Sequence, residues 1–341
     1  MSESGVTPVN DGATAVFLEG DRILGALMPT TRRTFCRTLA AAGSAGVLSL
    51  AQTQDPWAGL SIVDCHFHFR ATAEANVTHW DGCGVSNAVV LARESSAEQI
   101  AAVRSRHPGR VLGWFAGADI TKPEAENLLT TAVRAGAIGL GELKFHVEAA
   151  GPELQRMYAL AAEFNVAILV HFQEVPHTPT EGVFATGWKD FEPMLKRYPK
   201  TKFIGHADAF WANVSADYAN EAAYPAGKIK PGGITDKLLG DYPNLYGDLS
   251  ANSGNNALSR DPEFTEGFLK RHQDKLIFGS DCACSDGKGG GVSQQNNPGA
   301  SRLAGKCVAR ETLGLLKRTV SPAAFRKLTW ENAHRVYALK G

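Results

Sequence analysis

The chain has 341 residues, of which 44% are hydrophobic, and its 35 basic and 35 acidic side chains give a formal net charge of zero. This length suits one large domain or two modest ones. The balanced charge, without a basic stripe interleaved with aromatic residues, gives no electrostatic reason to expect nucleic-acid binding. No apolar run reaches the length of about 18 residues that a membrane helix needs, so we expect no stable membrane insertion.

The first part of the chain has the composition of an export signal. Arg32 and Arg33 are followed by an apolar segment of small residues, 39–50, and then by small residues before Gln52. This order is typical of a secretory leader, and the paired arginines resemble the bacterial twin-arginine signal. We therefore expect residues 1–51 to be an N-terminal extension with a signal peptide, and residues 52–341 to form one periplasmic domain. A core helix that happens to follow two arginines is the alternative, and Met28 is an alternative start.

The six cysteines do not have the spacing of a disulfide framework. Without Cys36 in the expected leader, five remain, and five cannot all pair within one chain. Cys282 and Cys284 are too close together for an ordinary zinc knuckle, so the sequence leaves their role open.

Beyond the leader, strand patterns alternate with helix patterns. Strands are expected at 61–68, 86–92, 111–116, 137–145, 166–172, 202–206, 244–249 and 276–281, and helices at 96–106, 122–135, 152–164, 189–198 and 262–272. Eight such repeats predict an α/β fold, a parallel (β/α)8 TIM barrel. A doubly wound open sheet is the alternative, but no Gly-x-Gly-x-x-Gly follows a strand. Two long connections, 207–243 and 282–301, are expected to form substrate walls at the carboxyl end of the barrel.

Several of the expected strands end in a side chain that can bind metal. The first ends in His66 and His68, which share one face by the period of two, and later strands end in His171, His206 and Asp281. A single residue of this kind at a strand end is weak evidence for a metal site. In a barrel, however, all carboxyl ends of the strands converge on one mouth, so together these residues predict a metal site.

From Ile62 to Leu339 the chain resembles the amidohydrolase superfamily, in particular its amidohydrolase-related branch of decarboxylases and lactonases. The motifs that carry the resemblance are Asp64-Cys65-His66-Phe67-His68, Leu143-Lys144-Phe145-His146, Val170-His171, Gly205-His206-Ala207, Tyr246-Gly247-Asp248-Leu249-Ser250-Ala251, Phe278-Gly279-Ser280-Asp281 and Glu331-Asn332-Ala333-His334-Arg335-Val336-Tyr337.

The resemblance implies a divalent metal, expected to be Zn²⁺, with ligands His66, His68, His171 and Asp281. His206 is then a further ligand or a substrate contact. The implied reaction is hydrolysis of a small ester, lactone or amide by metal-activated water, with Asp281 as general base and His206 polarising the carbonyl. Non-oxidative decarboxylation of a small carboxylic acid needs the same ligands and is the alternative. A binding protein without activity is a third hypothesis.

The fourth expected strand leaves the number of metals open. Glu142, Lys144 and His146 share one face by the period of two. In some relatives a residue of this strand bridges two metals. We favour one metal, with Lys144 contacting substrate or serving structure, and two metals as the alternative. Arg70 together with Lys144 would favour an anionic substrate. The substrate itself and homo-oligomer formation stay open.

Overall fold

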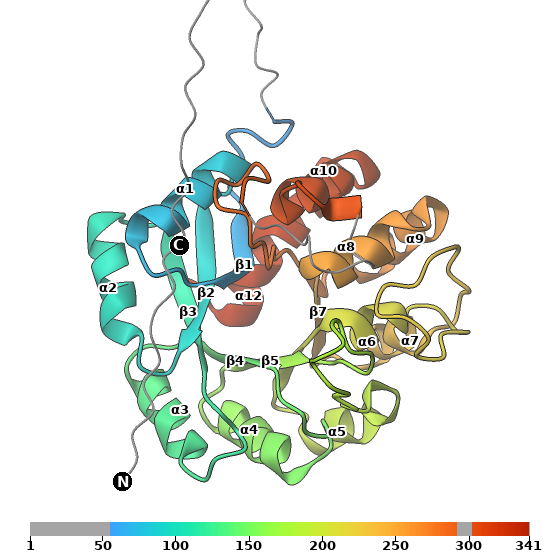
Figure 1. Ribbon diagram of the computed structural model, residues 1–341, viewed down its shortest axis with the longest axis horizontal. Coiled ribbons are helices and arrows are strands. Elements are labelled where there is room, and N and C mark those ends of the chain that lie inside the picture. The colour runs from blue at the N-terminus through green and yellow to red at the C-terminus, as the bar shows by residue number, and fades with distance from the viewer. Residues whose placement is uncertain (1–54, 292–301, 341) are drawn as a thin grey trace, which may run out of the picture. The chain divides into compact units, whose positions relative to one another are not determined.

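The computed structural model describes residues 55–291 and 302–340, which form eight parallel strands in sequential order. The strands are β1 (Val63–His68), β2 (Asn87–Arg93), β3 (Val111–Gly117), β4 (Gly139–Leu143), β5 (Ala167–His171), β6 (Lys202–His206), β7 (Leu245–Asp248) and β8 (Leu276–Ile277). The predicted (β/α)8 barrel is confirmed (Figure 1). The expected leader lies outside the described residues, so the domain boundary after residue 51 stays a prediction.

Backbone hydrogen bonds join the segment after β8 to β1. The N–H of Cys65 donates to the carbonyl of Phe278 at 3.1 Å, and the N–H of Asp281 donates to the carbonyl of His66 at 2.7 Å. The register of β1 against β2 shifts between Asp64 and Phe67. These bonds place Asp281 directly beside the two histidines of β1.

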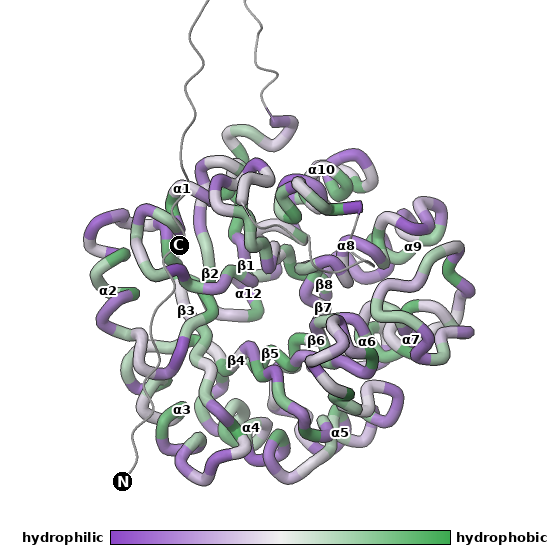
Figure 2. Tube along the Cα trace, in the orientation of Figure 1, coloured by the Kyte–Doolittle hydropathy of each residue, from purple (hydrophilic) through white to green (hydrophobic). Residues whose placement is uncertain are grey.

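Helices follow the strands and surround them in Figure 1. They are α1 (Ala73–Cys83), α2 (Ala97–Arg106), α3 (Ala125–Arg134), α4 (Pro152–Glu163), α5 (Glu192–Arg197), α6 (Ala207–Ala212), α7 (Ile234–Asp241), α8 (Ala251–Ser259), α9 (Pro262–His272), α10 (Val308–Thr319), α11 (Pro322–Arg326) and α12 (Asn332–Tyr337), with short helical turns at Trp188–Asp190 and Lys327–Glu331. Figure 2 shows hydrophobic and hydrophilic residues mixed along these helices, as expected where one side packs on a barrel.

Two hydrophobic clusters stabilise the barrel. The larger one lies between strands and helices and includes Trp80, Trp114 and Trp188. The smaller one joins alternate strand residues such as Val63, Val89 and Leu169 to Val336 and Tyr337 of α12. The alternation expected of strands therefore separates the barrel interior from the helix-facing side.

The sequence prediction differs from the structure in one connection and in one strand. Segment 207–243, expected to be a long loop, contains α6 and α7, and β8 has only two residues, Leu276–Ile277. In the described residues no helix is both long and apolar enough to span a bilayer.

Candidate metal centre at the carboxyl end of the barrel

The structure gathers six metal-capable side chains at the carboxyl ends of the strands. They are His66, His68, Glu142, His171, His206 and Asp281, and we call them the mouth cluster. His66 and His68 face the same two carboxylates: Nε2 of His68 lies 3.3 Å from both Glu142 Oε2 and Asp281 Oδ1, and Nε2 of His66 lies 3.8 Å from each. The predicted shared face of these histidines is therefore observed.

Glu142 lies at the centre of the mouth cluster. Its Oε2 faces His66 and His68, whereas its Oε1 contacts Nδ1 of His171 and lies 3.4 Å from Nε2 of His206. Each oxygen therefore faces a different pair of histidines. This arrangement offers two three-ligand sets that share one carboxylate.

Lys144 and His146 lie outside the mouth cluster, because β4 ends at Leu143 and the period of two does not continue beyond it. Nζ of Lys144 donates to Oε1 of Glu181 at 2.8 Å, and the ring of His146 stacks on Phe184. Of the three residues expected on one face, only Glu142 reaches the histidines. The structure thus supports a structural ion pair for Lys144.

The guanidinium of Arg70 also serves the fold. It donates to the backbone carbonyls of Cys284 at 2.8 Å, of Cys282 at 3.0 Å, and of Ser285 and Ala75 at 3.3 Å. Three of these carbonyls belong to the loop that follows β8 and the fourth, that of Ala75, belongs to α1, so this guanidinium joins the loop to α1. Its role in substrate binding stays a prediction without support from these contacts.

Two buried residues of the β7 segment orient the histidines, and the sequence did not single them out for this role. Nδ1 of His66 lies 2.5 Å from Oδ2 of Asp248, and Nδ1 of His206 lies 2.9 Å from Oγ of Ser250 and 3.2 Å from Oδ2 of Asp248. Ser250 in turn donates to Asp248 at 2.8 Å. A carboxylate that accepts the proton at Nδ1 leaves Nε2 as a lone pair, which is how metal-binding histidines are usually oriented.

Gln173 orients His171 through Nε2, whereas His66 and His206 are oriented through Nδ1. Its Oε1 lies 2.8 Å from Nε2 of His171, while its amide nitrogen donates to Val175 and Glu181. Because the amide oxygen can only accept, Nε2 of His171 carries a proton, so Nδ1, which contacts Glu142, is the nitrogen of this ring that could bind a metal ion.

The residues of the mouth cluster fit a divalent ion. Nε2 of His66 is completely buried and has no hydrogen-bond partner, which is costly for a polar atom unless it binds something. Two ligands about 2.1 Å from a tetrahedral ion lie about 3.4 Å apart, close to the separations of 3.3–3.8 Å found here. Imidazoles with carboxylates are a donor set typical of zinc.

Electrostatics at the mouth cluster favours a cation. Burial alone lowers the pKa of His66, but the carboxylates of Asp248, Asp281 and Glu142 raise it to about 9. Burial raises the pKa of Glu142, yet the neighbouring histidines, above all His171, hold it well below its usual value. Burial and the charge of His66 lower the pKa of His206, which keeps this imidazole neutral. The carboxylates are therefore ionised and attract positive charge.

A small glycine makes room for these contacts. A Cβ at Gly279 would lie 2.6 Å from Cβ of His66 and 2.7 Å from Oδ1 of Asp248. No side chain fits at that separation, so Gly279 allows the chain after β8 to approach β1 and β7 closely.

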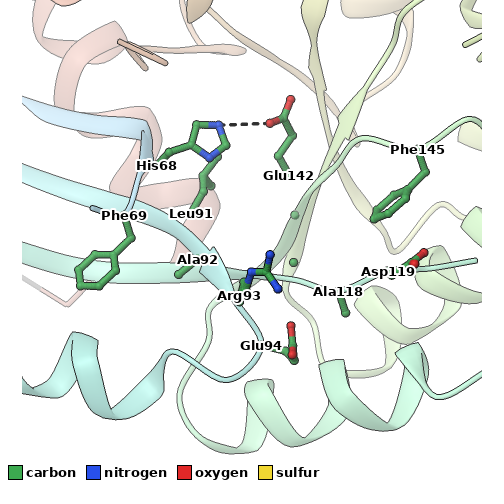
Figure 3. Close-up of a pocket in the computed structure, with 12 residues that line it drawn as sticks. His68, Phe69, Leu91, Ala92, Arg93, Glu94, Ala118, Asp119, Glu142 and Phe145 are labelled. Carbon is green, nitrogen blue, oxygen red and sulfur yellow. Dashed lines mark ion pairs between the residues drawn. The ribbon is translucent and has the colours of Figure 1, made fainter. Parts of the chain in front are cut away.

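A pocket of about 450 Å³ opens beside the mouth cluster. Figure 3 shows His68 and Glu142 at its edge together with Phe69, Leu91, Arg93 and Phe145. Arg93, at the end of β2, is exposed, and no described side chain pairs with its guanidinium. The pocket is large enough for a small organic molecule and offers it the guanidinium of Arg93. The sequence prediction did not include Arg93, because an arginine at a strand end has no distinguishing local pattern.

Known proteins resemble this chain in fold. The family model described as amidohydrolase matches residues 63–339. A probable 2-pyrone-4,6-dicarboxylic acid hydrolase from Acinetobacter baumannii, with citric acid bound, covers 82% of this chain and 100% of its own at 13% identity and a TM-score of 0.51. An amidohydrolase from Burkholderia multivorans gives the same coverages, 82% and 100%, at 14% identity and a TM-score of 0.52.

A third similar structure is a 5-carboxyvanillate decarboxylase from Novosphingobium aromaticivorans, complexed with manganese and 4-hydroxy-3-methoxy-5-nitrobenzoic acid. It covers 82% of this chain and 97% of its own at 10% identity and a TM-score of 0.50. No curated protein matches the sequence. At such identities the structural likeness concerns the fold, whereas the family match extends over nearly all the described residues. The chain therefore belongs to the amidohydrolase family of enzymes.

Proposed function

We propose that this enzyme is a metal-dependent hydrolase that opens an ester, lactone or amide bond of a small carboxylated molecule. The observation that carries the proposal is the buried Nε2 of His66, which has no partner and faces Glu142 and Asp281. The ligands of one ion would be His66, His68, Glu142 and Asp281. The predicted ligand His171 lies with His206 beside the other oxygen of Glu142, and these two histidines would hold a second ion. A divalent ion held there, expected to be zinc, would polarise a carbonyl and lower the pKa of a water molecule.

Asp281 is the residue best placed to accept a proton in this reaction. Its side chain is 28% exposed, whereas that of Glu142 is 9% exposed and that of His206 is 1% exposed. A general base must reach both the water and the substrate, so the more accessible carboxylate suits this role. The burial of His206 favours a role as a neutral metal ligand over the direct substrate contact that the sequence left open.

Arg93 supports a carboxylated substrate. Its guanidinium lines the same pocket as His68 and Glu142 and has no partner among the described residues. A planar guanidinium binds carboxylates with two parallel hydrogen bonds. The names of two proteins with a similar fold, a probable pyrone dicarboxylate hydrolase and a carboxyvanillate decarboxylase, refer to carboxylated molecules and agree with this assignment.

Decarboxylation is the second candidate, because the same pocket would bind a carboxylated molecule, and Asp281 in its protonated form would donate the proton that replaces the carboxyl group lost as carbon dioxide. The two reactions differ in their products. The zinc-loaded enzyme is incubated with aromatic and lactone carboxylates in ¹⁸O-labelled water. Label in the product without release of carbon dioxide is the expected result, whereas carbon dioxide without incorporated label would establish the decarboxylase and overturn the hydrolase.

The metal requirement is tested separately. His66→Ala combined with His68→Ala removes two ligands at the rim of the barrel, whose hydrophobic core does not involve them. We expect this variant to fold, to lose turnover and to bind less metal at the mouth cluster. Full occupancy of that cluster would refute the proposed ligand set. We also propose that the enzyme is exported through the twin-arginine machinery and acts in the periplasm.

A further inference from the structure

Three cysteines and one histidine that are distant in the sequence meet in a second buried cluster. Cys282 and Cys284 lie in the loop after β8, Cys307 directly precedes α10, and His79 lies in α1. All four are buried, and their ligand atoms lie within 4.8 Å of one another. The mouth cluster contains none of these residues. The sequence had left the role of the two loop cysteines open, because neither α1 nor Cys307 is near them in the chain.

We propose that His79, Cys282, Cys284 and Cys307 form a closed tetrahedral site that binds one zinc ion.

The distances within this cluster support a tetrahedral ion. Sγ of Cys282 lies 3.3 Å from Sγ of Cys284 and 3.8 Å from Sγ of Cys307, which in turn lies 3.8 Å from Nε2 of His79. With Zn–S bonds of about 2.3 Å and Zn–N bonds of about 2.0 Å, sulfurs of a tetrahedral site lie about 3.8 Å apart, and sulfur and nitrogen about 3.5 Å apart. Three thiolates and an imidazole are a donor set of structural zinc sites.

The histidine is oriented for such a site. Nδ1 of His79 lies 3.8 Å from Sγ of Cys83, and this thiol donates to the carbonyl of Trp80 at 3.5 Å. With its own proton donated there, the sulfur of Cys83 can accept a hydrogen bond from Nδ1–H of His79. Nε2 is then left as a lone pair on the side of Cys307. Asp248 orients His66 in the mouth cluster in the same way, by accepting the proton at Nδ1.

The charge of the site is also compensated. Three thiolates and one zinc ion carry a net charge of −1, which would be costly to bury without a nearby cation. The guanidinium of Arg70 donates to the carbonyls of Cys282 and Cys284, so a positive charge lies next to two of the ligands. Cys307 is the residue before α10, where the helix N-terminus stabilises a thiolate.

The proposed ion would hold the loop that carries Asp281. Cys282 follows Asp281 directly, and the ion would tie this loop to α1 on one side and to α10 on the other. The site has four protein ligands and leaves no position for a substrate, so its role is structural. It does not depend on the proposed hydrolysis, because the sulfur ligands are absent from the mouth cluster.

X-ray absorption at the zinc edge tests the proposal on the full chain carrying His66→Ala and His68→Ala, after incubation with zinc chloride under reducing conditions and removal of loosely bound metal. We expect sulfur neighbours at about 2.3 Å and a nitrogen neighbour at about 2.0 Å. A shell of nitrogen and oxygen alone would overturn the site. A protein that binds no zinc would also overturn the site. This holds whether titration of the thiols in denaturant finds all of them free or finds two fewer because a disulfide has formed.

Matched variants assign the ligands. Adding Cys282→Ser and Cys307→Ser should remove the sulfur shell and about one equivalent of zinc, whereas adding Cys65→Ser, a buried thiol outside the cluster, should leave both unchanged. A sulfur shell that survives Cys282→Ser with Cys307→Ser would refute these ligands. If the variant with both serines does not fold, the test is the absorption spectrum of the cobalt-loaded chain that carries only His66→Ala and His68→Ala. We expect a thiolate-to-cobalt charge-transfer band, and its absence would overturn the proposal.

Discussion

Nδ1 of His66 lies 2.5 Å from Oδ2 of Asp248, although the two residues are 182 positions apart in the chain. Both side chains are almost completely buried, with exposed fractions of 0% and 4%. The contact joins β1 to β7 and leaves Nε2 of His66 directed at Glu142 and Asp281. A carboxylate in this position fixes both the tautomer and the ring orientation of a metal ligand.

We therefore predict that Asp248→Asn weakens zinc binding at the mouth cluster by about 10- to 100-fold, the usual effect of losing an orienting carboxylate. Zinc affinity is measured by competition with a chromophoric chelator. Asp119→Asn is the control, because Asp119 lines the neighbouring pocket and, among the described residues, its carboxylate accepts hydrogen bonds only from Thr121. Equal affinities in the two variants would contradict the orienting role.

Asp281 separates metal binding from chemistry. Asp281→Asn keeps an oxygen ligand and the shape of the side chain but cannot accept a proton. We expect it to retain most of its metal while its turnover falls at least about 100-fold, as is typical when a general base is removed. Metal content by mass spectrometry and rate are measured on the same sample. A parallel fall of both would show that Asp281 is a ligand only, and no fall in either would place it outside the reaction.

Arg93 is predicted to bind the carboxylate of the substrate. A hydrogen bond between charged groups is worth about 1.5–3 kcal/mol, so Arg93→Met should raise KM about 10- to 100-fold with a smaller change in kcat. Arg106→Met is a matched control, because Arg106 pairs with Glu74 at the surface and does not line the pocket. If both variants had the same KM, substrate recognition would have to be assigned to other residues.

The titration of Glu181, which shares Gln173 as a partner with His171, should make the stability of the protein depend on pH. Burial raises its pKa, but hydrogen bonds from Lys144, the N–H of His177 and Gln173 lower it to about 2 from the ordinary value of 4.5. A carboxylate with a lowered folded-state pKa stabilises the protein above its unfolded pKa and loses this contribution as the pH falls. The contribution should therefore be complete above pH 4.5 and disappear as the pH falls towards 2.

Urea unfolding of the wild type and Glu181→Gln at about pH 6 and about pH 3 checks this, since the difference in their free energies of unfolding should shrink at the lower pH. Lys144→Met should lessen the same difference, because Lys144 donates the 2.8 Å hydrogen bond to Glu181. A difference that is independent of pH would mean that Glu181 titrates normally.

The export prediction concerns residues outside those that the structure describes. Replacing Arg32 and Arg33 by lysine should abolish twin-arginine export and leave a folded, active enzyme in the cytoplasm. Fractionation of cells that produce the two forms, followed by detection of the protein and its zinc, measures this. Normal export of the double variant would remove the twin-arginine assignment.

The sequence by itself determined the barrel and the region of the site. Strands alternate with helices, and in a parallel barrel the carboxyl ends of all strands lie at one mouth, so His66, His68, His171, His206 and Asp281 had to converge. The shared face of His66 and His68 follows from the period of two within a single strand. These are local regularities, and a local pattern is sufficient to predict them.

Only the tertiary structure decided which side chains touch. The partnership of His66 with Asp248 and the meeting of His79 with Cys282 and Cys307 join segments far apart in the chain, and no local pattern records which of many polar residues will pair. At the end of β4 the period of two stopped with the strand, so Glu142 entered the mouth cluster while Lys144 turned to Glu181. The roles of the arginines could not be predicted from the sequence either. Arg70 donates to loop carbonyls, whereas Arg93 faces the pocket. Long-range packing assigns such partners, because a flexible charged side chain can reach several of them from the same backbone position.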